Sequence, residues 1–225
     1  MERKITGLKA QKRNPNRVSV YLDGEYAFGL ARIVAAWLHV GQALDEHQIA
    51  RLKNQDTAEV AFQTALKHLS YRPRSEAEVR QKLSSSGYAE TVIEAVITRL
   101  QDSKLIHDAQ FAQLWVENRS AFRPRSQKLL KMELKQKGIH DDTIETALAD
   151  ANNDGELAYQ AAVRRVSRYA GLDWQQFRQK LGGFLARRGF SYGTIAPIVR
   201  SLWAEVQSGK HTNTLMENER INDES

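Results

Sequence analysis

The chain has 225 residues, of which 33 are basic and 27 acidic, and its net charge is +6 with neutral histidines. It contains no cysteine, which excludes disulfides, thiolate nucleophiles and cysteine-based zinc sites. No stretch approaches the ~20 apolar residues that span a bilayer. The first residues are charged with no apolar segment after them, so we expect a cytoplasmic protein without a membrane partner.

The N-terminal stretch has the alternation of a β-hairpin. Apolar residues alternate from Val18 to Leu22 and again from Tyr26 to Leu30, and Asp23-Gly24 between them is typical of a two-residue turn. Residues 5–11 could supply a third strand, because an isolated hairpin is only marginally stable. We expect two short helices next, around residues 31–38 and 46–53, so that residues 1–55 form an N-terminal region.

Residues 58–206 repeat three times with a period of 51. Each copy has a leucine, a glycine four residues later, and an apolar residue directly after the glycine. These positions are Leu83, Leu134 and Leu185, then Gly87, Gly138 and Gly189, then Tyr88, Ile139 and Phe190. A glycine just past a helix adopts the left-handed conformation of a Schellman motif, in which the leucine contacts the apolar residue. The pattern therefore predicts the same helix closure three times, as in an array of helical units.

Each copy also has periodic apolar segments on both sides of this closure. Residues 58–69, 111–119 and 157–169 precede the closing helix, and residues 93–100, 144–151 and 195–202 follow it. The closing helix starts at Ser75 with Glu78 in a capping box, and at Ser126 in the second copy. In the third copy the start moves forward to Asp173.

We therefore predict a mainly α fold of three tandem three-helix repeats in an elongated curved array, with a small N-terminal β-hairpin region. The repeats are expected at residues 56–106, 107–153 and 154–206, followed by a disordered polar tail at 207–225. The last helix should begin near Gly193 or Thr194, because Pro197 then falls in its first turn.

Basic residues gather in two of the repeats. Arg119–Lys137 holds seven with only Glu133 as an acid, and Arg164–Arg188 holds seven with only Asp173. Such clusters attract polyanions, although any single arginine could simply solvate a helix face.

A basic hook recurs one period apart. Arg72-Pro73-Arg74 before Ser75 returns as Arg123-Pro124-Arg125 before Ser126. A helix N-terminus carries free donors and partial positive charge, which suit a phosphate or carboxylate. The repetition indicates a shared binding surface.

At these residues the chain resembles the RecX family of regulatory proteins. The resemblance covers about two thirds of the chain and lies in motifs that keep their order and register. They are Tyr71-Arg72-Pro73-Arg74-Ser75 with Glu78, Val79, Lys82, Leu83 and Gly87; Leu105-Ile106-His107-Asp108 with Phe111, Ala112, Trp115 and Arg119; Phe122-Arg123-Pro124-Arg125-Ser126 with Leu134, Lys137 and Gly138; and Leu185-Ala186-Arg187-Arg188-Gly189-Phe190.

The resemblance implies a non-enzymatic modulator of the RecA recombinase, expected to be a monomer without cofactor or metal. Such a protein would lie in the groove of the RecA filament on DNA, restrain strand exchange and ATP hydrolysis, and favour filament shortening. Its partners would be the RecA filament and, weakly and without sequence preference, single- and double-stranded DNA. The residues predicted to contact filament or nucleic acid are Arg72, Arg74, Arg80, Arg119, Arg123, Arg125, Lys128, Lys131, Arg164, Arg165, Arg168, Arg187 and Arg188.

Two other functions stay open from the residues alone. One is a helix-turn-helix-like DNA-binding protein, and the other is a basic protein-interaction scaffold. The salt dependence of DNA binding separates them: steep and sequence-blind for a filament regulator, site-dependent for a transcription factor, absent for a scaffold. No phosphate-binding loop or metal-ligand spacing of histidines occurs, and Phe111 with Trp115 is expected to be core.

Overall fold

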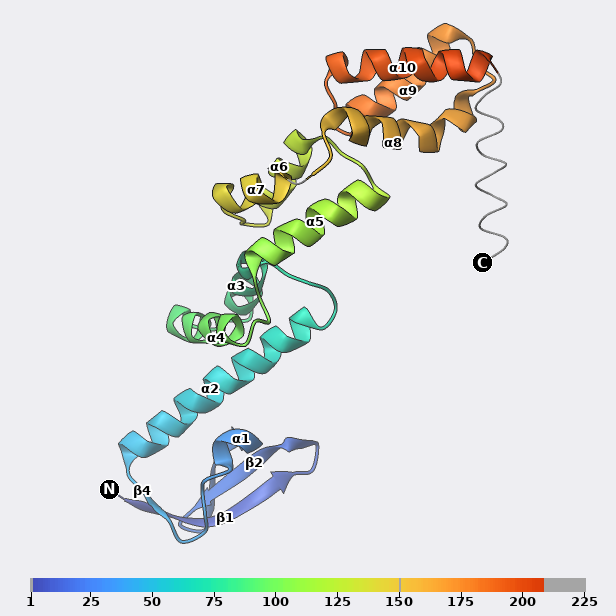
Figure 1. Ribbon diagram of the computed structural model, residues 1–225. Helices are drawn as coiled ribbons and strands as arrows, with labels where there is room; N and C mark the ends of the chain where they lie inside the picture. The colour runs from blue at the N-terminus through green and yellow to red at the C-terminus, as the bar shows by residue number, and fades with distance from the viewer. Residues whose placement is uncertain (1, 150, 209–225) are drawn as a thin grey trace. The chain divides into compact units, whose positions relative to one another are not determined.

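The computed structural model describes residues 2–149 and 151–208, and the chain divides into two compact units between His107 and Asp108 (Figure 1). The predicted tail lies outside the described residues from residue 209 on. The first unit consists of β1 Arg3–Gln11, β2 Asn14–Leu22, β3 Glu25–Ala31, α1 Arg32–Ala35, β4 Ala43–Leu44, α2 Glu46–Leu69, α3 Glu76–Ser85 and α4 Glu90–Asp102. The second consists of α5 Asp108–Phe122, α6 Gln127–Gln136, α7 Asp141–Ala149, α8 Asp154–Val166, the 3-10 turn η1 Ser167–Tyr169, α9 Trp174–Ala186 and α10 Tyr192–Gln207.

The predicted hairpin and third strand are confirmed. Strands β2 and β3 are joined by Asp23 and Gly24, whose φ angles of 52° and 93° are those of a type I′ turn. β1 pairs antiparallel with β2, and β4 adds a fourth strand, giving the order β3-β2-β1-β4. The alternating apolar residues, such as Val20 and Leu22, form one buried face together with Ile5.

Helix α2 corrects the predicted helices of the N-terminal region. A separate short helix was expected around residues 46–53, but α2 runs unbroken for 24 residues from Glu46 to Leu69. It starts in a capping box of Asp45 and Gln48, and its span contains no glycine or proline to stop it. The boundary expected after residue 55 therefore lies inside a helix. Asp56 there accepts the backbone N–H of Ala31 (2.5 Å), which ties the sheet to the helix.

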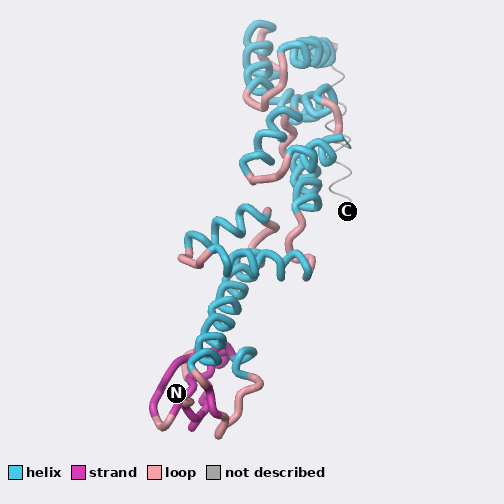
Figure 2. The backbone as a smooth tube through the Cα atoms, turned by 90° about the vertical axis from the view of Figure 1, so that its left-hand side faces the viewer, coloured by secondary structure: helices cyan, strands magenta, loops and turns pink. Residues whose placement is uncertain are grey.

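The sheet lies toward the N-terminal end of α2, whereas α3 and α4 pack toward its C-terminal end (Figure 2). The C-terminal part of α2 thus forms the first three-helix repeat with α3 and α4. Helices α5–α7 form the second repeat, and α8–α10 form the third.

The three predicted helix closures are confirmed. Gly87, Gly138 and Gly189 have φ angles of 84°, 76° and 88°. In each Schellman motif the N–H of the next residue donates to the leucine carbonyl, at 3.3 Å in the first copy, 3.1 Å in the second and 3.4 Å in the third. The predicted starts also hold, because the side chains of Ser75, Ser126 and Asp173 cap α3, α6 and α9.

Helix α10 begins earlier than the sequence predicted. Its N-cap is Ser191, so the first helical residue is Tyr192 rather than Gly193 or Thr194. Pro197 consequently lies in the second turn. The carbonyl of Gly193 therefore receives no intrahelical N–H from residue 197.

The second and third repeats are joined at the start of α6. The backbone N–H of buried Ser126 donates to the carbonyl of Arg188 (3.0 Å), and that of Gln127 donates to the Asp154 carboxylate (2.7 Å). A Cβ built on Gly189 would lie 2.5 Å from Ser126 Oγ, so only glycine fits this contact. The joint fixes how the basic loops of the two repeats meet.

Candidate nucleic-acid interface

One acid offsets part of the charge of the first basic hook. Glu78 accepts from Arg72 at 2.8 Å and lies 3.7 Å from Arg74, and its side chain is only 15% exposed. Both predicted site residues of this hook therefore share one carboxylate, which lowers the positive potential at the start of α3.

Arg80 is also paired, although the sequence placed it among the filament contacts. Its guanidinium bonds to Glu94 at 2.7 Å, to Glu76 at 2.7 Å and to Glu90 at 3.4 Å. Hydrogen bonds to Glu94 and Glu76 raise the pKa of Arg80 above its usual range. This arginine links α3 to α4 inside the first repeat.

Glu133 has the equivalent role in the second repeat. Its side chain is 12% exposed and accepts from Trp115 Nε1 (2.9 Å), Arg119 Nε (3.0 Å) and Arg125 Nη1. Trp115 stacks on buried Phe111, as predicted for a core pair, and Arg119 lies over the indole ring at 4.4 Å. The sequence identified Glu133 as a lone acid but gave no sign that it binds two of the predicted arginines.

A cluster of positive charges with little compensation forms where the second and third repeats meet. We call Arg123, Arg125, Arg164, Arg165 and Arg188 the arginine cluster. Arg188 donates to the carbonyl of Pro124 (2.8 Å), and Arg164 donates to that of Ala121 (2.7 Å). Within the described part of the chain, only Arg125 of these five pairs with a carboxylate.

The charges of the cluster act on one another at Arg188. Burial lowers the pKa of the Arg188 guanidinium, and the positive charges of Arg125, Arg165, Arg123 and Arg164 lower it further. The ring of Phe184 lies beneath Arg188 at 4.5 Å and Arg165 at 5.3 Å, which orients both planar groups.

The arginine cluster comes from three separate segments: the loop between α5 and α6, the end of α8, and the closure after α9. In the sequence these belonged to two different basic stretches. The bond from Ser126 N–H to the Arg188 carbonyl brings them together. Periodicity predicted each repeat by itself, and nothing in it indicated which loops of neighbouring repeats meet.

The remaining predicted residues lie near the cluster in sequence. Lys131 bonds to Glu145 at 3.1 Å, whereas Lys128, Arg168 and Arg187 are exposed and form no ion pair within the described residues. Guanidinium groups donate to phosphate in a planar fork, so an array of them suits a phosphate backbone.

The described residues hold no group of three possible metal ligands, and none of their helices is long and apolar enough to cross a membrane.

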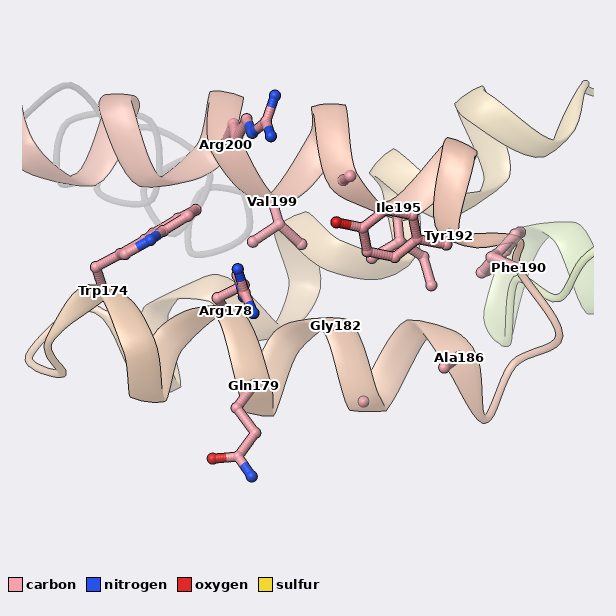
Figure 3. Close-up of a pocket in the computed structure, with 12 residues that line it drawn as sticks. Trp174, Arg178, Gln179, Gly182, Ala186, Phe190, Tyr192, Ile195, Val199 and Arg200 are labelled. Carbon is pink, nitrogen blue, oxygen red and sulfur yellow. The ribbon is translucent and has the colours of Figure 1, made fainter.

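The third repeat also has an apolar groove of about 330 Å³ between α9 and α10. Ile195 and Val199 line it from α10, and Gly182 lines it from α9. Figure 3 shows Arg178 reaching into the space between the helices, whereas Gln179 points away from it. Arg178 and Arg200 line the groove without a carboxylate partner in the described chain.

Four protein-family models match the chain along its length. They are described as the regulatory protein RecX N-terminal domain at residues 3–45 and the RecX first, second and third three-helix domains at residues 61–100, 108–148 and 153–199. The matched segments coincide with the sheet region and the three repeats.

Curated relatives show the same similarity over most of the chain. Regulatory protein RecX of Leuconostoc mesenteroides is 34% identical over 201 residues, which are 88% of this chain and 74% of that protein. Regulatory protein RecX of Clostridium botulinum is 30% identical and is covered to 95%. A crystal structure of regulatory protein RecX has a TM-score of 0.68 at 31% identity, over 87% of this chain and 98% of that one. The structure of RecX from Lactobacillus salivarius has a TM-score of 0.56 at 30% identity and covers 66% of this chain.

Proposed function

The chain belongs to the RecX family of regulatory proteins, which are not enzymes, and from this premise we propose that it binds the RecA–DNA filament. It acts there as a monomer in the filament groove, where it lowers recombinase and ATPase activity or promotes filament disassembly. RecA as partner comes from the family resemblance. The contact with DNA rests on one observation, the arginine cluster.

The cluster suits a phosphate backbone better than a single anion. Four of its five guanidinium groups have no carboxylate within the described chain, so their charge is available to a polyanion. Two of them, Arg164 and Arg188, also donate to backbone carbonyls, which fixes their orientation. Phosphate contacts of this kind carry no sequence information. We therefore expect weak, sequence-independent binding that falls steeply with salt.

The first hook contributes less to this surface. Glu78 already neutralises part of the charge of Arg72 and Arg74, and Arg80 is held by three acids. We accordingly place the main DNA contact in the second unit and give the first hook a weaker role.

The test is a titration of the protein into RecA on single-stranded DNA, in which ATP turnover and filament length are measured. Arg123→Ala with Arg164→Ala should weaken inhibition and reduce the salt slope of DNA binding by about 0.7 for each phosphate that the variant no longer neutralises. Arg80→Ala is the matched control, since it also removes an arginine but leaves the cluster intact. Equal inhibition by the double variant and the wild type would refute the cluster as the contact.

In the first and second repeats the helix-turn-helix-like alternative is disfavoured by the charges at the helix starts. α4 begins with Glu90, and α7 begins with Asp141 and Asp142. A recognition helix presents its first turn to the edges of bases between two phosphate strands. Carboxylates there would repel the DNA.

A protein-binding role is favoured by the groove between α9 and α10. Its apolar lining and its two arginines, Arg178 and Arg200, which form no ion pair within the described residues, are complementary to a partner segment with an apolar side chain flanked by carboxylates. Gly182→Leu would fill the groove from α9. It should weaken binding to the RecA protein without DNA and leave binding to free DNA unchanged.

A further inference from the structure

Two exposed aromatic rings occupy the same position in the first and second repeats. Tyr71 and Phe122 are one period of 51 apart, and each stands directly before the first arginine of its hook. Their residues are 72% and 74% exposed. Exposing an aromatic ring to water contributes nothing to folding stability, and the fold buries neither ring.

Phe122 lies in the chain between two residues that connect it to the arginine cluster. It is the last residue of α5, the exposed Arg123 follows it, and the carbonyl of Ala121 before it accepts from Arg164 at 2.7 Å. An exposed apolar residue is thus next in the chain to Arg123 and to the carbonyl that Arg164 binds, and neither arginine forms an ion pair within the described residues. A ligand that covers this surface must offer both an apolar face and negative charge.

An unpaired nucleotide has both features. Its base presents a flat π-face to an aromatic ring, and its phosphates meet the arginines on either side. Paired bases in a duplex have no free face at this surface, because they are stacked on one another. An acidic peptide is the other ligand with both features, and a comparison of DNA with and without bases separates the two.

We propose that Phe122 is a stacking platform for an unpaired nucleobase, so that the arginine cluster prefers single-stranded nucleic acid to the duplex. This inference rests on the proposed DNA contact of the cluster and adds the base to it. Tyr71 is the corresponding platform of the first repeat. Its contribution is smaller because Glu78 neutralises Arg72 beside it.

The test compares two single strands of equal length, an oligothymidine and an abasic oligonucleotide with the same phosphates and no bases. Wild type should bind the oligothymidine more tightly. Phe122→Ala should bind the oligothymidine about 5- to 150-fold more weakly than wild type does, which is the range measured for one stacked base. It should bind the two strands equally. Its affinity for the abasic strand should not change.

Two variants serve as controls. Leu114→Ala removes another exposed apolar side chain of α5, 46% exposed, and should leave both affinities unchanged. Phe122→Trp keeps a π-face and should retain the preference, with fluorescence quenched when the base stacks. Because the ring is exposed, Phe122→Ala should have the same melting temperature as the wild type.

The double variant Arg123→Ala with Arg164→Ala separates failure of this inference from failure of the DNA contact itself. Its loss of affinity should be equal for the two strands, because phosphates alone are affected. If Phe122→Ala weakens both strands equally, or weakens neither while losing RecA binding, the stacking platform is refuted although the arginine contact stands. If wild type binds neither strand, both proposals fail.

Discussion

Replacing Gly189 by alanine tests the joint between the second and third repeats. Gly189 has a φ of 88°, and an added Cβ would lie 2.5 Å from Ser126 Oγ and 3.1 Å from Leu129 Cβ. Gly87 is the matched position in the first repeat: its φ is 84°, and nothing lies within 4 Å of its Cβ position. Both substitutions strain the backbone alike, so their difference isolates the contact across the joint.

The magnitude follows from these two contributions. The left-handed conformation costs an alanine about 1 kcal/mol at either position. At Gly189 the crowded Cβ adds about 1–3 kcal/mol of overpacking. Ser126 must shift, which also weakens its bond to the N–H of Leu129 (3.2 Å) and so the cap of α6. We expect a loss of about 1 kcal/mol for Gly87→Ala and about 2–4 kcal/mol for Gly189→Ala.

Urea unfolding followed by circular dichroism measures the two losses, and amide hydrogen exchange assigns each loss to its unit. Gly189→Ala should also weaken DNA binding, because Arg188 precedes the strained residue, whereas Gly87→Ala should not. Losses of stability that agree within about 0.5 kcal/mol would show that the joint is not tightly packed, and the position of the arginine cluster would lose its explanation.

Three further predictions concern stability and the second hook. Gly138→Val forces a β-branched residue to a φ of 76° and should lower unfolding stability by more than about 1 kcal/mol in urea melts; an unchanged midpoint would contradict the closure. Arg123→Ala with Arg125→Ala should leave helicity and melting temperature nearly unchanged, because Glu133 keeps two other donors. Inhibition of RecA should weaken. If the variant unfolds instead, these arginines have a structural role. Burial and the charge of Arg74 lower the pKa of His68. The folded state therefore binds fewer protons than the unfolded state, so stability should fall as the pH drops through about 6.5, and less so in His68→Gln; equal pH dependence in both proteins would exclude the histidine.

The sequence predicted the helical repeats well because their closures depend on local physics. A glycine at a left-handed position and an apolar pair five residues apart are sufficient to specify a Schellman motif, so Gly87, Gly138 and Gly189 could be identified without a structure. Helix α2 was predicted as two helices because the polar residues around Asp56 interrupt the apolar pattern. Polarity does not break a helix that contains neither glycine nor proline.

Features that depend on distant partners were missed. β4 has only two residues, Ala43 and Leu44, and exists because β1 offers an open edge to them. The arginine cluster likewise depends on which loops meet, and the meeting is fixed by backbone bonds such as Ser126 N–H to the Arg188 carbonyl. That bond joins two backbone groups, and it does not depend on either side chain. No sequence pattern therefore predicts it.

The different charge balance of the two hooks follows from one repeat position. Glu78 binds both arginines of the first hook, and the residue one period later is Leu129, which cannot. The second repeat instead binds Arg125 through Glu133, whose counterpart in the first repeat is Lys82, and this leaves Arg123 without a carboxylate in the described chain. The same backbone hook is therefore partly neutralised in the first repeat, whereas the second repeat keeps one hook arginine without a carboxylate in the described chain. Repetition supplied the geometry of each hook, and the different residues at two period positions decide which copy offers more positive charge to an anion.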